Sequence, residues 1–138
     1  MQNNNGKGPQ RIIPMLAYDD APAAMDFLRD AFGFEEKYRM AMPDGNIGHA
    51  EMALSGSVVM LATTWKAGGL ASPKDLPAMP YQLFCEVDDV DGHFRRARGA
   101  GAVVVAAPED QPYGFRTYRA LDPEGHRWIF ASPVASAQ

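Results

Sequence analysis

Two stretches of this chain repeat the same pattern of apolar and polar positions. Residues 13–20 predict a strand that ends in an acidic pair, and residues 82–89 repeat that pattern. Each acidic pair can cap a helix, because its carboxylates accept hydrogen bonds from the free N–H groups of the first turn. Residues 21–32 carry an apolar stripe at helical spacing, residues 90–98 form the second predicted helix, and glycines follow both. The pattern therefore predicts two similar strand–helix units.

Three short strands follow each predicted helix, and turn residues separate them. The expected strands are Glu35–Ala41, His49–Leu54, Val58–Thr63, Ala102–Ala106, Arg116–Leu121 and His126–Ala131. The chain is thus predicted to be one α+β domain over residues 11–133, built from βαβββ units at about 11–64 and 81–133. Gly and Pro at 64–80 predict a linker with no regular structure, and the polar residues 1–10 predict a frayed tail.

Strand side chains alternate between two faces of a sheet, and one face must pack on the helices. The other face mixes apolar and polar side chains, which is the composition of a small-molecule pocket. A ligand, a partner chain or the other half of the protein would cover it. The register of the strand that holds Tyr118 and Arg119 is open, and one of the two is expected to reach the pocket. The candidate ligand-binding residues are Met60, Trp65, Gln82, Phe84, Glu86, Tyr118, Arg127 and Ile129.

Composition and charge exclude two classes of partner. The formal net charge is -4 and the Lys and Arg residues are scattered, which argues against a nucleic-acid-binding face. No apolar run approaches the roughly 18 residues that a membrane helix needs, and no signal peptide is recognised, so a cytoplasmic location is expected. Cys85 lies in an apolar strand and is expected to be a buried, inert thiol.

A few polar residues are candidates for chemistry. His49 and Glu51 share one face of a predicted strand, so they form either a catalytic or metal-binding pair or a hydrogen-bonded pair on a polar pocket wall. Glu86 and Arg127 are expected to form an ion pair, because a buried carboxylate without a partner is costly. The alternative is that Arg127 binds a carboxylate or phosphate of the ligand. His93 is expected to be solvated on the second helix.

Segments of the chain are similar to a known family. They are the acidic pair and helix at 19–34, His49-Ala50-Glu51-Met52, and Asp122-Pro123-Glu124-Gly125-His126-Arg127-Trp128. Over residues 11–133 the chain resembles the vicinal oxygen chelate superfamily, which includes glyoxalase I, bleomycin-resistance proteins, fosfomycin-resistance enzymes and ring-cleaving dioxygenases. The resemblance implies a U-shaped mixed sheet around a pocket, helices on the outer face, and a homodimer.

Enzymes of that superfamily hold a divalent metal with four side chains, and the resemblance maps these positions to Ile13, Met60, Gln82 and Ile129. Only Gln82 offers a ligand atom, and one amide oxygen does not hold a hard cation. We therefore expect no metal and no cofactor, and we predict a metal-independent protein that binds a small molecule such as an antibiotic or another aromatic compound. The alternatives are a lyase, isomerase or dioxygenase with a non-standard site around His49, Glu51 and Gln82, and an interaction domain whose open sheet face binds another protein.

Overall fold

The computed structural model describes residues 10–134, so all but the last residue of the expected tail lies outside the described residues. Its regular elements are β1 (Met15–Tyr18), α1 (Ala21–Phe32), β2 (Glu35–Ala41), β3 (Ile47–Leu54), β4 (Ser57–Thr63), η1 (Lys66–Gly68), η2 (Pro73–Asp75), β5 (Leu83–Glu86), α2 (Val90–Gly99), β6 (Val103–Asp110), β7 (Phe115–Leu121) and β8 (Arg127–Pro133). The α+β prediction with two βαβββ units is confirmed. No helix within residues 10–134 is long and apolar enough to cross a membrane.

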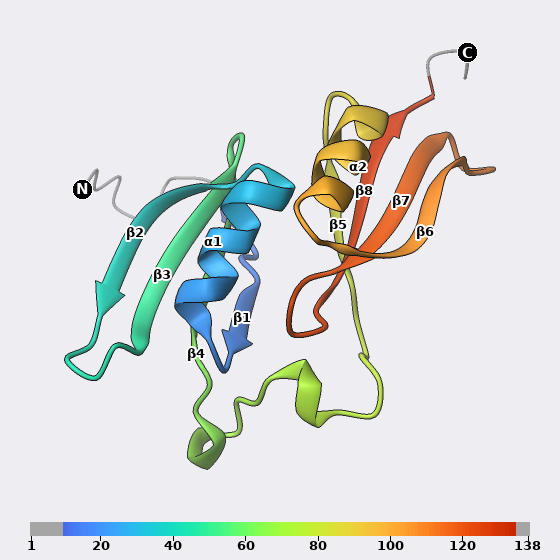
Figure 1. Ribbon diagram of the computed structural model, residues 1–138. Coiled ribbons are helices and arrows are strands. Elements are labelled where there is room, and N and C mark those ends of the chain that lie inside the picture. The colour runs from blue at the N-terminus through green and yellow to red at the C-terminus, as the bar shows by residue number, and fades with distance from the viewer. Residues whose placement is uncertain (1–9, 135–138) are drawn as a thin grey trace.

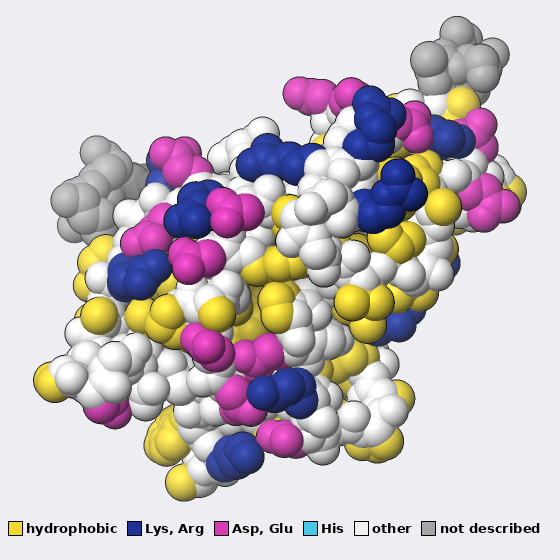
Figure 2. Space-filling model, viewed as in Figure 1, with side chains coloured by type: hydrophobic (Ala, Val, Ile, Leu, Met, Phe, Trp, Pro, Cys, Tyr) yellow, Lys and Arg dark blue, Asp and Glu magenta, His cyan; other side chains and the backbone are white. Residues whose placement is uncertain are grey.

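The strands form two four-stranded sheets, with the orders β1-β4-β3-β2 and β5-β8-β7-β6. We call them, with their helices, unit 1 and unit 2. The edge strands β1 and β5 run parallel to their neighbours β4 and β8, and the other strand pairs are antiparallel. Both helices lie on the same side of the molecule, each in front of its own sheet (Figure 1). Acidic and basic side chains are interspersed over this side (Figure 2).

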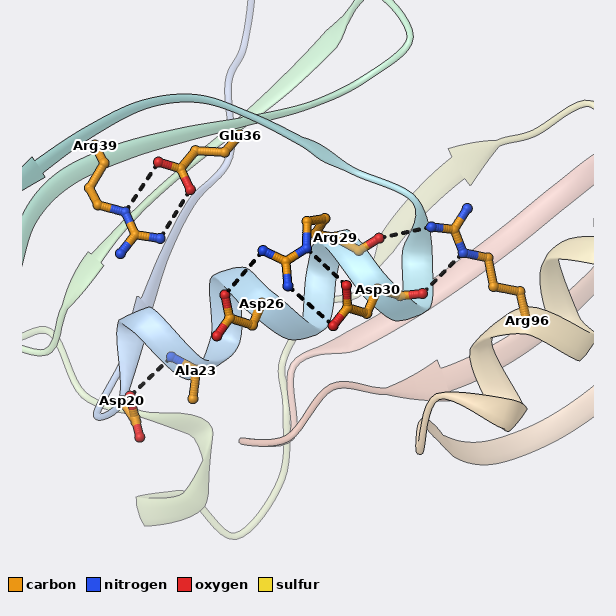
Figure 3. A network of polar contacts seen from close by, with 8 residues as sticks. All are labelled: Asp20, Ala23, Asp26, Arg29, Asp30, Glu36, Arg39 and Arg96. Carbon is orange, nitrogen blue, oxygen red and sulfur yellow. Dashed lines mark hydrogen bonds and ion pairs between the residues drawn. The ribbon is translucent and has the colours of Figure 1, made fainter.

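Helix α1 begins and ends where the sequence places its signals. The Asp20 carboxylate accepts a hydrogen bond from the Ala23 N–H at 3.1 Å, and Gly33 ends the helix with a left-handed φ of 80°. On the outer face Arg29 lies between Asp26 and Asp30 (Figure 3). The buried face carries Met25, Leu28 and Phe32 among its large side chains. Burial of each contributes roughly 1.5–3 kcal/mol.

Helix α2 joins the two units through side chains that reach the end of α1. The last carbonyl groups of a helix have no partner within it. Arg96 donates hydrogen bonds to the carbonyls of Asp30 and Arg29, both at 3.0 Å (Figure 3). His93 Nε2 donates to the Phe32 carbonyl at 2.9 Å. The expectation that His93 is solvated is therefore wrong, because the imidazole is part of the contact between the helices.

A second contact between the units is buried and polar, and we call it the inter-unit junction. It consists of Tyr18, Ser72, Asp122, Glu124 and Trp128. Asp122 Oδ2 accepts hydrogen bonds from the Tyr18 hydroxyl at 2.6 Å and from Trp128 Nε1 at 3.1 Å. Glu124 is only 6% exposed. Its carboxylate accepts the backbone N–H groups of residues 19 and 20 and the Ser72 hydroxyl, at 2.7, 2.8 and 2.6 Å.

The segment between the units has more structure than expected. Residues 64–80 contain the short helices η1 and η2 and a β-bridge between Trp65 and Leu70, so the prediction of no regular structure is wrong. Ser72 is fully buried, and the hydrogen bond that its hydroxyl donates to Glu124 satisfies this buried polar group. The linker is thus held against unit 2 instead of only spanning the distance between the units.

Candidate functional site

Each sheet has one face on its helix and one face turned away from it, which we call the open face. Cross-strand partners share a face, so the register assigns the side chains. The open face of unit 1 carries Met15, Tyr38, Met40, His49, Glu51 and Met60. The open face of unit 2 carries Phe84, Glu86, Phe115, Thr117, Arg119, Leu121, Arg127, Ile129 and Ala131. These two faces carry most of the candidate ligand-binding and catalytic residues predicted from the sequence.

The polar centre of the unit 1 open face is the pair of His49 and Glu51. His49 Nε2 donates to Glu51 Oε2 at 3.1 Å, and both side chains are partly exposed. The Tyr38 ring lies 6.0 Å from the imidazole, centre to centre. A hydrogen-bonded histidine and glutamate can accept a proton from a bound compound or donate one to it. No group of three or more His, Cys, Asp or Glu side chains that could hold a metal ion occurs in the part of the chain that the structure describes.

The four positions that correspond to the superfamily's metal ligands do not fit a divalent cation. Met60 and Ile129 lie on the open faces, and Met60 pairs with Met15 while Ile129 pairs with Phe84. The thioether of Met60 is a poor donor for a hard cation, and Ile129 has no donor atom. Ile13 likewise offers none, which leaves one amide oxygen from Gln82. No chemical step can be assigned to a metal at these positions.

Two aromatic rings meet above the middle of the unit 2 open face. Phe84 in β5 and Phe115 in β7 lie edge to face with their centres 5.4 Å apart, although β8 separates the two strands. Because the rings meet over β8, they cover its open-face side chains, and Ile129 and Ala131 are buried. Phe84 itself remains 47% exposed. Ile129 is expected from the sequence to contact the ligand, but the two rings cover it. The apolar surface that a ligand can reach on this face is therefore aromatic.

The register of β7 decides between the two candidates that the sequence left open. Tyr118 pairs with Phe130, which places it on the helix side with 0% exposure, so its placement in the pocket is wrong. Its hydroxyl hydrogen-bonds to His93 Nδ1, and burial raises the pKa of this hydroxyl. Arg119 pairs with Ile129 and takes the open-face position. Tyrosine and arginine both suit either face of a strand, so only the partner strand could identify Arg119.

The ion pair expected between Glu86 and Arg127 does not form. In the register of the sheet Glu86 pairs with Ala131, which lies further along β8 from Arg127 than the two side chains can bridge. No carboxylate of residues 10–134 lies within 4.0 Å of the Arg127 guanidinium. Glu86 borders a cleft of about 390 Å³ beside α2. Arg127 borders another cleft, of about 400 Å³, between the linker and the β7–β8 turn.

Three of the candidate residues line three different clefts of the described chain. Phe84 borders a groove of about 440 Å³ with Ile13 and Val58, apart from the clefts of Glu86 and Arg127. Trp65 lies in the linker and is largely exposed. Phe84, Glu86 and Arg127 thus line three different clefts of the described chain.

Cys85 faces the helix side of β5, next to the candidate surface. Burial raises the pKa of its thiol to about 12. At neutral pH almost none of the reactive thiolate is present in such a group. The environment fits the predicted inert thiol, and it argues against covalent chemistry at this residue.

Comparison with known proteins gives consistent matches to one family. The model of the Glyoxalase/Bleomycin resistance protein/Dioxygenase superfamily matches residues 12–130. Uncharacterized proteins of Mycobacterium tuberculosis and Mycobacterium bovis are 40% identical over 126 residues, covering 89% of this chain and 74% and 83% of those proteins.

Solved structures agree. TioX from Micromonospora sp. ML1 is 33% identical with a TM-score of 0.73, covering 91% of this chain and 100% of that chain. The fosfomycin resistance protein FosX from Listeria monocytogenes is 14% identical with a TM-score of 0.66, covering 92% of this chain and 95% of that one, a likeness of fold alone.

Proposed function

This chain belongs to the Glyoxalase/Bleomycin resistance protein/Dioxygenase superfamily, and on that premise we propose that it binds a small apolar or aromatic molecule without a metal. The observation that carries the proposal is the chemistry of the four metal-ligand positions. Ile13, Met60 and Ile129 replace donor side chains there, whereas the surfaces around them keep exposed aromatic and polar groups. A binding surface that has lost its catalytic ligands suits sequestration of a compound better than its conversion.

We further propose that the functional form is a homodimer whose cavity lies between copies. The inter-unit junction and the α1–α2 contact fix the two units of one chain through their helix side, while Met15 and Phe84 of the open faces stay exposed. Met15 is 68% exposed and Phe84 is 47% exposed, and contiguous apolar surface can mark an interaction site. A second copy that laid its unit 1 against unit 2 of the first would cover both. Sedimentation should then give twice the chain mass of 15.0 kDa, and a monomer would contradict this form.

Metal content and ligand binding, measured on the same sample, test the proposed function. The protein is purified without an affinity tag or chelator, analysed for divalent metals, and titrated with aromatic compounds. We expect no stoichiometric metal, and we expect the bound compound to be recovered intact. One metal per chain, together with loss of binding after chelation, would contradict the proposal.

A second candidate function is supported by the hydrogen bond between His49 and Glu51. A lyase or isomerase could use this pair as its proton-transfer group, since it lies on the open face and is accessible. That hypothesis predicts turnover of a bound compound that Glu51→Gln abolishes. The matched control is Glu36→Gln, which changes a carboxylate on the helix side that pairs with Arg39. Full activity of the Glu51 variant would exclude the hypothesis.

A further inference from the structure

The unit 2 open face places two arginines close together. Arg119 in β7 pairs with Ile129 of β8, and Leu121 pairs with Arg127. Arg119 and Arg127 are therefore diagonal neighbours on one face of adjacent antiparallel strands, with backbones roughly 7 Å apart. Two guanidinium groups in this arrangement repel each other unless a negative charge lies between or beside them.

Neither arginine has a negative partner within the described residues. No carboxylate lies within 4.0 Å of either guanidinium, and Arg119 Nε is buried without a hydrogen-bond partner. Arg116 lies on the same strand but faces the helix side, where it pairs with Asp91 at 3.2 Å and with Asp110 at 3.1 Å. The chain thus supplies carboxylates for the arginine on one face of β7 and none for the arginine on the other.

A buried donor on a guanidinium is costly to leave unpaired, and arginine cannot lose its proton to reduce that cost. His126 Nδ1 is also buried and unpaired, but it is a different case. Its Nε2 donates to the Ala17 carbonyl at 2.9 Å, so Nδ1 is the nitrogen that carries no proton in the neutral ring. Among residues 10–134, Arg119 Nε is therefore the buried side-chain donor that lacks an acceptor.

Apolar surface flanks the two arginines on both sides. On one side Phe84 and Phe115 present the aromatic surface of the open face. On the other side Arg127 borders the cleft of about 400 Å³ that Leu76 and Met79 of the linker help to line. A ligand bound here would thus meet a cationic centre next to an aromatic wall and a small apolar cleft.

We propose that Arg119 and Arg127 bind an anionic oxygen group, a carboxylate or a phosphate, of the ligand whose aromatic body lies against Phe84 and Phe115. The planar fork of arginine suits both groups, because two parallel N–H donors match two acceptor oxygens. This assignment rests on the proposed function and narrows it, since a neutral aromatic compound would leave both guanidinium groups unpaired.

Calorimetric titration of the full chain with three matched probes tests the assignment. The probes are 2-naphthoate, 2-naphthyl phosphate and the neutral 2-naphthamide. We expect at least one of the anions to bind about tenfold more tightly than the amide, and the stronger anion identifies the group. Arg119→Gln and Arg127→Gln should each lower anion affinity to that of the amide and leave amide binding unchanged. Arg127 is partly exposed, so its variant tests the assignment even if the Arg119 variant folds poorly.

The control variant is Arg116→Gln, which removes a positive charge from the opposite face of the same strand and should keep the preference for the anion. If the amide binds the wild-type chain as tightly as both anions, or if both open-face variants keep the preference, the assignment is wrong while the proposed function stands. If none of the three probes binds up to about 1 mM, both are wrong.

Discussion

The inter-unit junction and the open face of unit 2 both contain buried polar atoms of charged side chains, but only at the junction do these atoms have partners within the described chain. At the junction three donors surround the Glu124 carboxylate, and they come from unit 1 and the linker. On the open face Arg119 Nε has no acceptor within the described chain. A buried charge whose partners are all present within the chain holds the fold together. The unpaired Nε of Arg119 is the atom for which we propose a partner in the ligand.

The largest expected effect is on the junction itself. Glu124→Ala should lower the free energy of unfolding by about 3 kcal/mol, because it leaves two partly buried N–H groups of unit 1 and the buried Ser72 hydroxyl without their acceptor. Urea unfolding followed by circular dichroism measures it. Glu109→Ala, which changes an exposed carboxylate of β6, is the matched control and should stay within about 0.5 kcal/mol of wild type. Equal stability of the two variants would show that the junction does not hold the units together.

Substitution of Arg119 should have the opposite effect on stability. Arg119→Met should leave the free energy of unfolding unchanged or raise it by up to about 1 kcal/mol, since it removes a buried Nε–H that has no acceptor and keeps the apolar stem. Arg116→Met, on the helix side of the same strand, should instead lower the free energy of unfolding slightly, because it removes two ion pairs that solvent screens. A clear destabilisation by Arg119→Met would mean that this side chain has a structural role.

The contact between the helices should make stability depend on pH. Burial lowers the pKa of His93, whose Nδ1 accepts from the Tyr118 hydroxyl while Nε2 donates to the Phe32 carbonyl. The unfolded chain therefore takes up a proton at higher pH than the folded chain. The folded state therefore keeps its full stability above pH 6.5, the ordinary pKa of histidine. Its stability falls as the pH decreases from 6.5 toward the lower pKa of His93 in the folded chain.

Unfolding midpoints at pH 7.5 and pH 5.5 test this prediction. The decrease on acidification should be smaller in His93→Gln than in the wild-type chain. If the two chains lose the same stability over this interval, His93 is not the group responsible.

The smallest effect is expected from the exposed ion pairs of the helix side. Glu36→Gln breaks the pair with Arg39 and should change the free energy of unfolding by less than about 0.5 kcal/mol, because solvent screens these charges. Thermal unfolding at low and high salt would measure it. A loss above about 1 kcal/mol would mean that the outer network contributes more than its exposure suggests.

The fold followed from local signals, whereas the site depended on partners that the sequence does not display. The acidic pairs, the helix glycines and the alternation within strands predicted both βαβββ units. The sequence left Tyr118 and Arg119 undecided because only pairing with Phe130 and Ile129 sets the face of each. The sequence predicted His93 to be a surface residue because its partners, Phe32 and Tyr118, belong to other elements.

Titration of the untagged chain with the tighter-binding of 2-naphthoate and 2-naphthyl phosphate, with and without EDTA, tests the central claim that ligand binding is independent of metal and directed by the arginines. The account predicts the same affinity under both conditions and a loss of about tenfold in the Arg119→Gln variant. Binding that disappears with EDTA, or that is as strong in the variant as in the wild-type chain, would contradict it.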